Sequence, residues 1–139
     1  MRTIERLVFV YDAKSGSLAA FASSARKMLL VKSCALCTIT HGVLGERKEW
    51  RACRSMLPVP IDYHHRDDLP DTLRSITAGV LPCIAVVLDG GTPTILLDSI
   101  ELEACAGSPP ELVRRLQLAA SRRGFSFEVG DAAQSASAR

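Results

Sequence analysis

Aromatic side chains and net charge are both scarce in this sequence of 139 residues, which has 5% aromatic residues and a formal net charge of +2. Proteins that bind nucleic acids usually combine a basic surface with aromatic side chains on which bases stack, so we predict no nucleic-acid partner. No apolar run approaches the roughly 20 residues of a transmembrane helix, so we predict no membrane partner. The composition, with 47% apolar and 23% charged residues, is typical of a globular protein.

The amino-terminal segment lacks the features of a signal peptide. Residues 1–13, MRTIERLVFVYDA, have a glutamate before the apolar run and no small-residue cleavage site, and we interpret the run as a first strand. The five cysteines cannot all pair within one chain, which favours a reducing compartment. We therefore predict a cytoplasmic protein. Its length predicts a single domain over residues 1–125, and the small, polar residues that follow predict a disordered tail over residues 126–139.

The segment 80–97, VLPCIAVVLDGGTPTILL, gives the clearest structural signal in the chain. Its apolar run Cys83–Leu88 and its second run Thr94–Leu97 are joined by Asp89-Gly90-Gly91, where glycine supplies the positive φ of a tight hairpin turn. The first run does not alternate polar with apolar residues, which predicts an interior strand covered on both faces. Pro82 stands at the start of that strand, where a missing N–H is tolerated.

The remaining elements follow from apolar periodicity, helix caps and breakers. No such signal defines residues 31–45, which contain a Cys-x-x-Cys motif. The elements expected outside the hairpin are a strand over 4–11, a helix over 18–30, a helix over 46–56, a strand over 61–64, a helix over 67–77, a short helix over 98–105 and a helix that begins after Ser108 and ends before Gly124.

Apart from an inserted segment with the Cys-x-x-Cys motif and a helix, this order of elements resembles the thioredoxin-like fold. The predicted class is therefore α/β, with the order β-α-(inserted CxxC segment and helix)-β-α-β-β-α and a mixed central sheet. Gly79-Val80-Leu81-Pro82 resembles the family's segment before its cis-proline, so the resemblance implies a cis peptide bond at Pro82. The chain is also similar to small uncharacterised bacterial thioredoxin-like proteins with a similar Cys-x-x-Cys stretch, a likeness that implies no activity.

The position of the cysteines departs from that family. Thioredoxins carry Cys-x-x-Cys directly after the first strand, at the amino end of a helix that stabilises the thiolate. Here residues 13–16 contain no cysteine, and Cys34 and Cys37 follow the expected helix over 18–30. A straight helix rises about 1.5 Å per residue and would place the pair ~20 Å from Pro82. On this reasoning the family's catalytic role does not transfer to the pair by position.

The motif Cys34-Ala35-Leu36-Cys37 carries the most specific candidate chemistry. Two intervening residues let both sulfurs converge on each other or on one metal ion. In a redox site Cys34 would be the nucleophile, favoured by nearby Lys32, and Cys37 would resolve the mixed disulfide. The protein would then be a thiol-disulfide oxidoreductase or a thiol sensor, without a cofactor, and its partner would be a protein thiol or disulfide.

Two alternatives stay open for this motif. A zinc site needs about two more ligands beside Cys34 and Cys37, and the candidates in the chain are His41, Cys53 and His64. The protein would then be a binding module that holds zinc or another thiophilic ion. The second alternative is a catalytically silent scaffold that binds a partner, in which the two cysteines have no special chemistry.

Residues 63–68, Tyr-His-His-Arg-Asp-Asp, gather titratable groups at the end of an expected strand. Adjacent side chains of a strand point to opposite faces, so only one of His64 and His65 can join a given site. One interpretation is a metal ligand, or a general base held by Asp67 or Asp68. The other is a solvated strand end followed by the acidic start of a helix.

Overall fold

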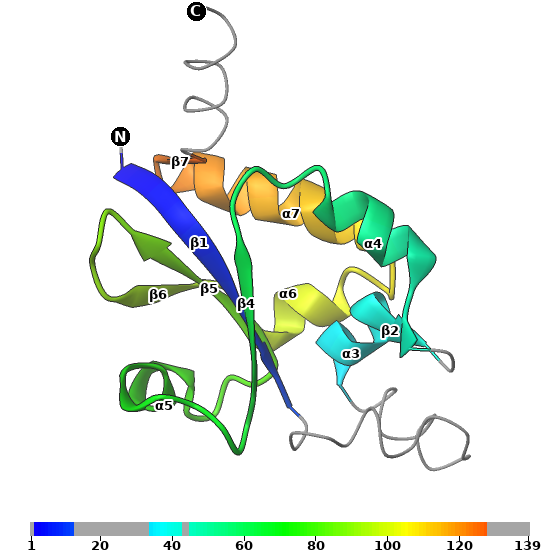
Figure 1. Ribbon diagram of the computed structural model, residues 1–139, viewed down its shortest axis with the longest axis horizontal. Helices are drawn as coiled ribbons and strands as arrows, with labels where there is room; N and C mark the ends of the chain where they lie inside the picture. The colour runs from blue at the N-terminus through cyan, green and yellow to red at the C-terminus, as the bar shows by residue number, and fades with distance from the viewer. Residues whose placement is uncertain (1, 13–33, 43–44, 128–139) are drawn as a thin grey trace, which may run out of the picture.

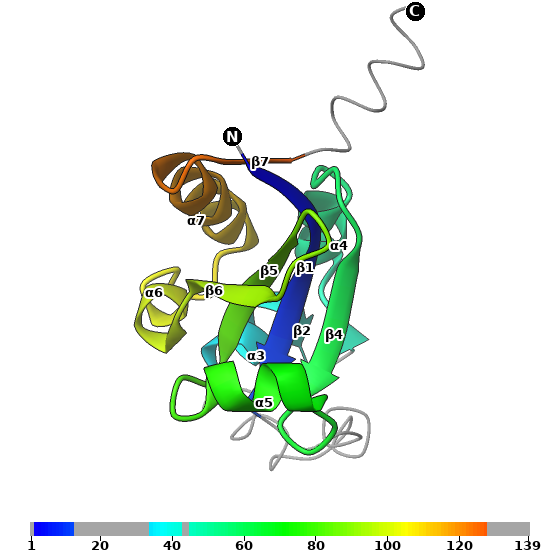
Figure 2. The same cartoon turned by 90° about the vertical axis from the view of Figure 1, so that its left-hand side faces the viewer.

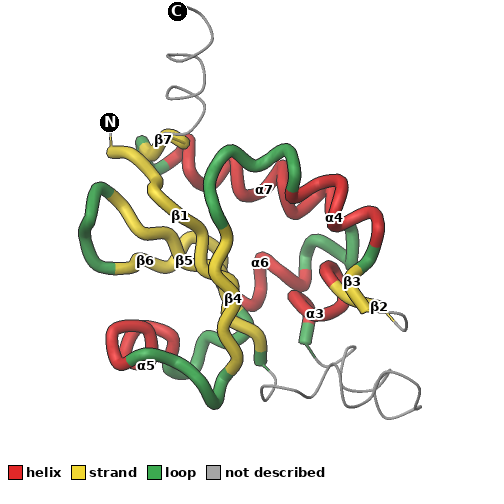
Figure 3. The backbone as a smooth tube through the Cα atoms, in the orientation of Figure 1, coloured by secondary structure: helices red, strands yellow, loops and turns green. Residues whose placement is uncertain are grey.

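The computed structural model describes residues 2–12, 34–42 and 45–127 and shows a mixed α/β protein. Its central strand β1 (Arg2–Tyr11) pairs in parallel with β4 (Ile61–His65) and antiparallel with β5 (Cys83–Leu88). Strand β6 (Pro93–Leu97) pairs antiparallel with β5, which gives the order β4-β1-β5-β6. A short strand β7 (Phe125–Phe127) lies parallel to the start of β1 (Figures 1 and 3). The predicted mixed central sheet is confirmed.

Helices cover both faces of this sheet (Figure 2). Helix α5 (Asp71–Thr77) lies on one face, where Leu73 packs with Val8, Val10 and Cys83 in a small apolar cluster. The other helices enclose the larger core on the opposite face, which we call the dithiol face because it holds Cys34 and Cys37. The helices are α3 (Ala35–Thr40), α4 (Lys48–Arg54), α5 (Asp71–Thr77), α6 (Ser99–Glu103) and α7 (Pro109–Arg122). None of them, within the described part of the chain, has the length and apolar character needed to cross a membrane.

The expected hairpin is present at the expected place. Strand β5 is an interior strand between β1 and β6, and five of its six residues are buried. The turn uses positive φ at Asp89 (41°) and at Gly90 (72°), the geometry that twists the two strands into register. The peptide bond between Leu81 and Pro82 is cis, as the resemblance implies.

Capping residues begin the two helices after the hairpin, and for α7 the sequence indicates the cap at Ser108. Asp98 and Glu101 form a reciprocal capping box at the start of α6. Ser108 accepts a hydrogen bond from the N–H of Glu111 at the start of α7, and prolines occupy its first turn. Gly124, with φ of 72°, follows the end of α7 and turns the chain into β7.

Several predicted boundaries need correction. Helix α5 begins at Asp71 and not at residue 67, because Pro70 precedes it in an extended conformation. The prediction of a disordered tail from residue 126 is wrong for residues 126 and 127, which belong to β7. The helix expected over 18–30 lies outside the described residues. The segment that carried no pattern contains α3 and a two-stranded hairpin, β2 (His41–Gly42) and β3 (Gly45–Glu46).

Candidate dithiol site

The two cysteines of the motif lie at the amino end of α3. Cys34 is the N-cap residue, in an extended conformation with φ of −123° and ψ of 107°. Its sulfur accepts a hydrogen bond from the backbone N–H of Cys37, over a distance of 3.4 Å. A cap usually uses an oxygen for this bond, and here the thiol takes that place. The first cysteine therefore lies where an anionic sulfur is stabilised by the unpaired N–H groups of a helix start.

The site adjoins the carboxyl end of β1. The hydroxyl oxygens of Tyr11, the last residue of β1, and Thr40 on α3 are 3.0 Å apart, and the backbone N–H of Asp12 stabilises the Cys34 thiolate. Pro82 precedes Cys83, which pairs with Val10, so it lies at the same end of the sheet. Cys34, next to the Asp12 backbone, and Pro82 therefore both adjoin the end of β1, and the separation of ~20 Å expected from a straight helix is not found.

Both thiols are fully buried, and their pKa values move in opposite directions. A hydrogen bond from the Cys37 thiol lowers the pKa of Cys34, and the backbone N–H groups of Cys37 and Asp12 add to this effect against the opposing effect of burial. The same hydrogen bond and burial raise the pKa of Cys37. When the pair loses one proton, Cys34 is therefore the sulfur that carries the negative charge, and Cys37 keeps its proton.

Arg47 fixes the opposite end of α3. Its Nη1 donates to the backbone oxygens of Thr38, Ile39 and Gly107, over 3.1, 3.3 and 2.7 Å. Its Nη2 pairs with Glu49, at 2.9 Å. A cation at the carboxyl end of a helix satisfies carbonyls that have no partner within the helix. Arg47 therefore holds the dithiol helix against the loop between α6 and α7.

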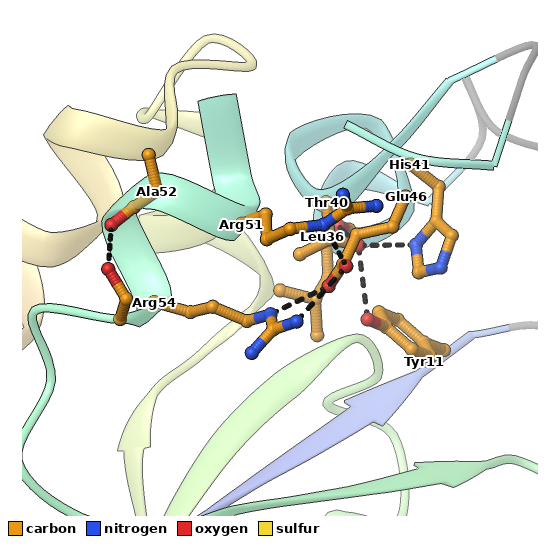
Figure 4. Close-up of polar contacts among 9 residues, drawn as sticks. Tyr11, Leu36, Thr40, His41, Glu46, Arg51, Ala52 and Arg54 are labelled. Carbon is orange, nitrogen blue, oxygen red and sulfur yellow. Dashed lines mark hydrogen bonds and ion pairs between the residues drawn. The ribbon is translucent and has the colours of Figure 1, made fainter. Parts of the chain in front are cut away.

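A chain of polar contacts runs from Tyr11 to His41 beneath the helix (Figure 4). The Thr40 hydroxyl oxygen lies 3.0 Å from the Tyr11 hydroxyl, 2.7 Å from His41 Nδ1 and 3.0 Å from the backbone oxygen of Leu36. Tyr11 is buried, and burial raises its pKa well above the ordinary value. His41 is half-buried at the end of the helix, so the chain links a buried phenol to a more accessible imidazole.

Rings from β1, β4 and α4 form an aromatic wall on the dithiol face. Phe9 contacts Trp50, with ring centroids 5.4 Å apart, and Tyr63, at 5.6 Å. Tyr11 stacks with Tyr63 at 6.2 Å and touches His65 at 5.6 Å. Tyr63 and His65 of β4 thus hold the Tyr11 ring in place, and His41 also contacts it, edge-on, with ring centroids 5.8 Å apart.

The ligands proposed for a metal do not gather around the pair. His41 Nδ1 faces the Thr40 hydroxyl, and Cys53 lies on α4, where burial raises its pKa. His64 alternates with Tyr63 and His65 along β4, so its side chain points to the face of α5. Over residues 2–12, 34–42 and 45–127, no three His, Cys, Asp or Glu side chains are placed to hold one ion.

Asp68 contacts both histidines of the segment after β4. Its carboxylate accepts a hydrogen bond from the backbone N–H of His65 at 2.7 Å and lies 3.2 Å from His65 Nδ1 and 3.7 Å from His64 Nδ1. Of the two histidines, His65 is the one that shares the dithiol face, through its contact with Tyr11. Of the two carboxylates considered for such a pairing, Asp68 is the one that contacts His65.

Sequence reasoning missed Tyr11, Thr40 and Arg47. Tyr11 ends an apolar run, and the pattern assigns it only to the strand over 4–11, although a buried phenol needs a polar partner. That requirement is the signal that could have singled it out. Thr40 and Arg47 lie in or near the segment without periodicity, and only their tertiary contacts give them a role. The sequence matches no family model, and neither a curated protein nor a solved structure matches the chain.

Proposed function

We propose that this protein is a thiol-based redox protein on a thioredoxin-like scaffold, with Cys34 as nucleophile and Cys37 as resolving cysteine. The scaffold part of the proposal is supported by the strand order β4-β1-β5-β6 with one parallel and two antiparallel pairings. It is also supported by the helix between β4 and β5 on one face and the carboxyl-terminal helix on the other. Together these features support a thioredoxin-like scaffold.

The arrangement of the two sulfurs at one helix start carries the functional part. Cys34 has a lowered pKa and Cys37 a raised one, so Cys34 is the sulfur that ionises first and attacks, while a protonated sulfur lies beside it. Buried cysteines without such donors behave as small apolar residues. The hydrogen bond from the backbone N–H of Cys37 to the Cys34 sulfur is therefore the observation on which the proposal depends.

The reaction follows from these two states. The Cys34 thiolate attacks one sulfur of a partner disulfide, forms a mixed disulfide and releases the first partner sulfur as a thiolate. Cys37 then loses its proton and attacks the Cys34 sulfur, which forms the Cys34–Cys37 disulfide and releases the second partner thiolate. The dithiol is oxidised and the partner disulfide is reduced. Because both sulfurs are buried, the first attack requires a local opening at the amino end of α3.

Redox titration followed by intact-mass spectrometry tests the proposal. Equilibration with mixtures of reduced and oxidised glutathione is expected to yield an intramolecular disulfide, visible as the loss of two hydrogens and mapped by peptide analysis to Cys34 and Cys37. Cys34→Ser and Cys37→Ser should each abolish this product. Cys83→Ser is the matched control, since it removes another fully buried thiol and should leave the product unchanged.

Two results would contradict the proposal. A metal ion retained in native mass spectrometry and lost in Cys34→Ser would favour the zinc-binding alternative. A dithiol that stays reduced in every glutathione mixture would favour the silent scaffold.

A further inference from the structure

Strand β4 forms an open edge of the central sheet. It stands at the end of the strand order β4-β1-β5-β6, and among the described residues it pairs with β1 alone. Figure 2 shows it at the outer side of the sheet, with β1 between it and β5. An edge strand presents backbone N–H and C=O groups that a further strand can bind. The position of such groups on β4 therefore determines what can pair with it.

The register with β1 fixes which residues of β4 face outward. The N–H of Leu7 donates to the backbone oxygen of Pro60, over 3.0 Å. In a parallel pair, alternate residues of a strand bind one neighbour, and the residues between them face away from it. The backbone groups of Asp62 and His64 therefore bind β1. Three residues of β4 direct their backbone groups to the open edge: Ile61, Tyr63 and His65.

Asp68 occupies the outward groups of His65. Its carboxylate accepts a hydrogen bond from the His65 N–H at 2.7 Å, and its own N–H donates to the His65 backbone oxygen at 3.1 Å. At the other end of the strand, Pro60 precedes β4 and has no N–H. Ile61 and Tyr63 remain, and within the described part of the chain their outward N–H and C=O groups have no partner.

The open edge of Ile61 and Tyr63 is complementary to itself. When two copies of β4 run antiparallel about an axis at Asp62, Ile61 of each copy lies opposite Tyr63 of the other, and such opposed residues exchange both hydrogen bonds. An axis at Tyr63 would set Ile61 against His65, whose backbone groups are already bound. An axis at Ile61 would set Tyr63 against a residue that precedes the strand. Only the register about Asp62 uses the free groups of both residues.

The side chains around Asp62 fit the same register. Ile61 and Tyr63 share the dithiol face, where Ile61 is half-buried and Tyr63 is 39% exposed. In the paired copies each Ile61 would cover the Tyr63 ring of the other, and aromatic rings opposite β-branched side chains stabilise antiparallel pairs. On the face of α5 the two Asp62 carboxylates would meet, but Arg6 binds each of them at 2.8 Å and offsets their repulsion.

We propose that two copies of this protein pair through β4, antiparallel and in register about Asp62, and so join their sheets into one. The pairing uses the backbone of β4 and neither cysteine, so it does not rest on the proposed redox function. The contact is small, and small interfaces of this kind belong to transient complexes. Asp68 limits the contact, because its bonds to His65 stop the pairing from extending along the strand.

Sedimentation velocity and amide hydrogen exchange, both measured on the full chain from micromolar to millimolar concentration, test the pairing. We expect a reversible shift from monomer to dimer as the concentration rises. Exchange of the Ile61 and Tyr63 amides, followed by NMR, should slow in step with that shift, because these N–H groups are bound only in the dimer. The His65 amide is an internal control, since its bond to Asp68 should slow its exchange equally at every concentration.

Variants of the edge separate strand pairing from association through another surface. Ile61→Pro removes an outward N–H but no hydrogen bond to β1, and proline is tolerated at such edge positions. Because the substitution enters the dimer twice, the association constant should fall roughly tenfold. Ile61→Val keeps the N–H and should associate as the native chain does.

Asp68 offers a second, opposite test. Asp68→Ala frees the backbone groups of His65, lengthens the open edge and should raise the association constant severalfold. Asp68→Asn is the matched control, because its side-chain oxygen can still accept from the His65 N–H and should leave the constant unchanged. A lower constant in Asp68→Ala would contradict the limit that we assign to Asp68.

Three results would overturn the proposal. A chain that stays monomeric at millimolar concentration has no such pairing. Association that Ile61→Pro leaves within twofold of the native constant would show that the copies meet through another surface. If Ile61→Pro does not fold, the amides decide: exchange of Ile61 and Tyr63 that does not change with concentration, whether fast or slow, would mean that no second copy covers this edge.

Discussion

Cys34 and Cys83 are two thiols with the same burial and opposite chemistry. Both are fully buried, and both lie near the end of the sheet where β1 finishes. Yet the pKa of Cys34 is lowered, whereas burial raises the pKa of Cys83 to about 12. Cys34 lies on the dithiol face and Cys83 on the face of α5.

The difference comes from hydrogen-bond donors and not from exposure. Cys34 caps a helix and receives donors from Cys37 and from the backbone of Asp12. Cys83 begins a strand and packs against Val8, Val10 and Leu73. Burial costs an anion the same solvation in both places, so the donors decide which thiol ionises. A buried cysteine is therefore a candidate nucleophile only where the fold supplies donors to its sulfur.

The largest effect we expect is a loss of unfolding free energy when a side chain is removed from the core on the dithiol face, compared with the core on the face of α5. Phe9→Ala removes a ring that joins Trp50 and Tyr63 on the dithiol face and should lower the free energy of unfolding by about 3–5 kcal/mol. Leu73→Ala, in the smaller cluster, should cost about 2–3 kcal/mol. Urea denaturation measures both losses. A larger loss for Leu73→Ala than for Phe9→Ala would contradict the prediction that the core on the dithiol face contributes more to stability than the smaller cluster.

A smaller effect is expected from loosening the dithiol helix alone. Arg47→Met keeps the aliphatic stem but leaves three carbonyls without their charged donor, so the free energy of unfolding should fall by about 1–3 kcal/mol. The pKa of Cys34 should rise towards its ordinary value as the helix start loses its position. Arg74→Met is the control, since Arg74 and its partner Asp71 are exposed and such pairs contribute at most about 1 kcal/mol. Equal losses in both variants would contradict the role of Arg47.

The smallest effect concerns alkaline stability. Because the pKa of Cys83 is raised to about 12, the unfolded chain releases this proton near its ordinary pKa, roughly 8.5, while the folded protein keeps it. Stability from Cys83 is complete below that pH and is lost as pH rises, by about 1.5 kcal/mol between roughly pH 8.5 and 10. Cys83→Val lacks this thiol, so its unfolding free energy should fall less over the same range in urea titrations. If the unfolding free energies of the two proteins fall in parallel with pH, burial does not raise the pKa of Cys83.

The sheet could be predicted from local pattern, and the site could not. The unbroken apolar run Cys83–Leu88, followed by the turn residues Asp89-Gly90, is typical of a short strand buried on both faces, so the interior strand could be predicted. Helix α3 has only six residues, two of them threonines, and it is held by Tyr11 and Arg47, which are distant in sequence or outside the helix. The separation of ~20 Å between the cysteine pair and Pro82 follows from the rise per residue of one straight helix, and local pattern could not show that Cys34 and Pro82 both adjoin the end of β1.

A direct measurement of the Cys34 pKa tests the central claim that donors, and not exposure, make this thiol reactive. The ultraviolet absorbance of the thiolate can be titrated in a variant whose Cys53, Cys83 and Cys105 are replaced by alanine, with Cys34→Ser in the same background as reference. We predict one ionisation below the ordinary thiol value of about 8.5, absent from the reference, and a second far above it. Two ionisations at or above the ordinary value would contradict the account.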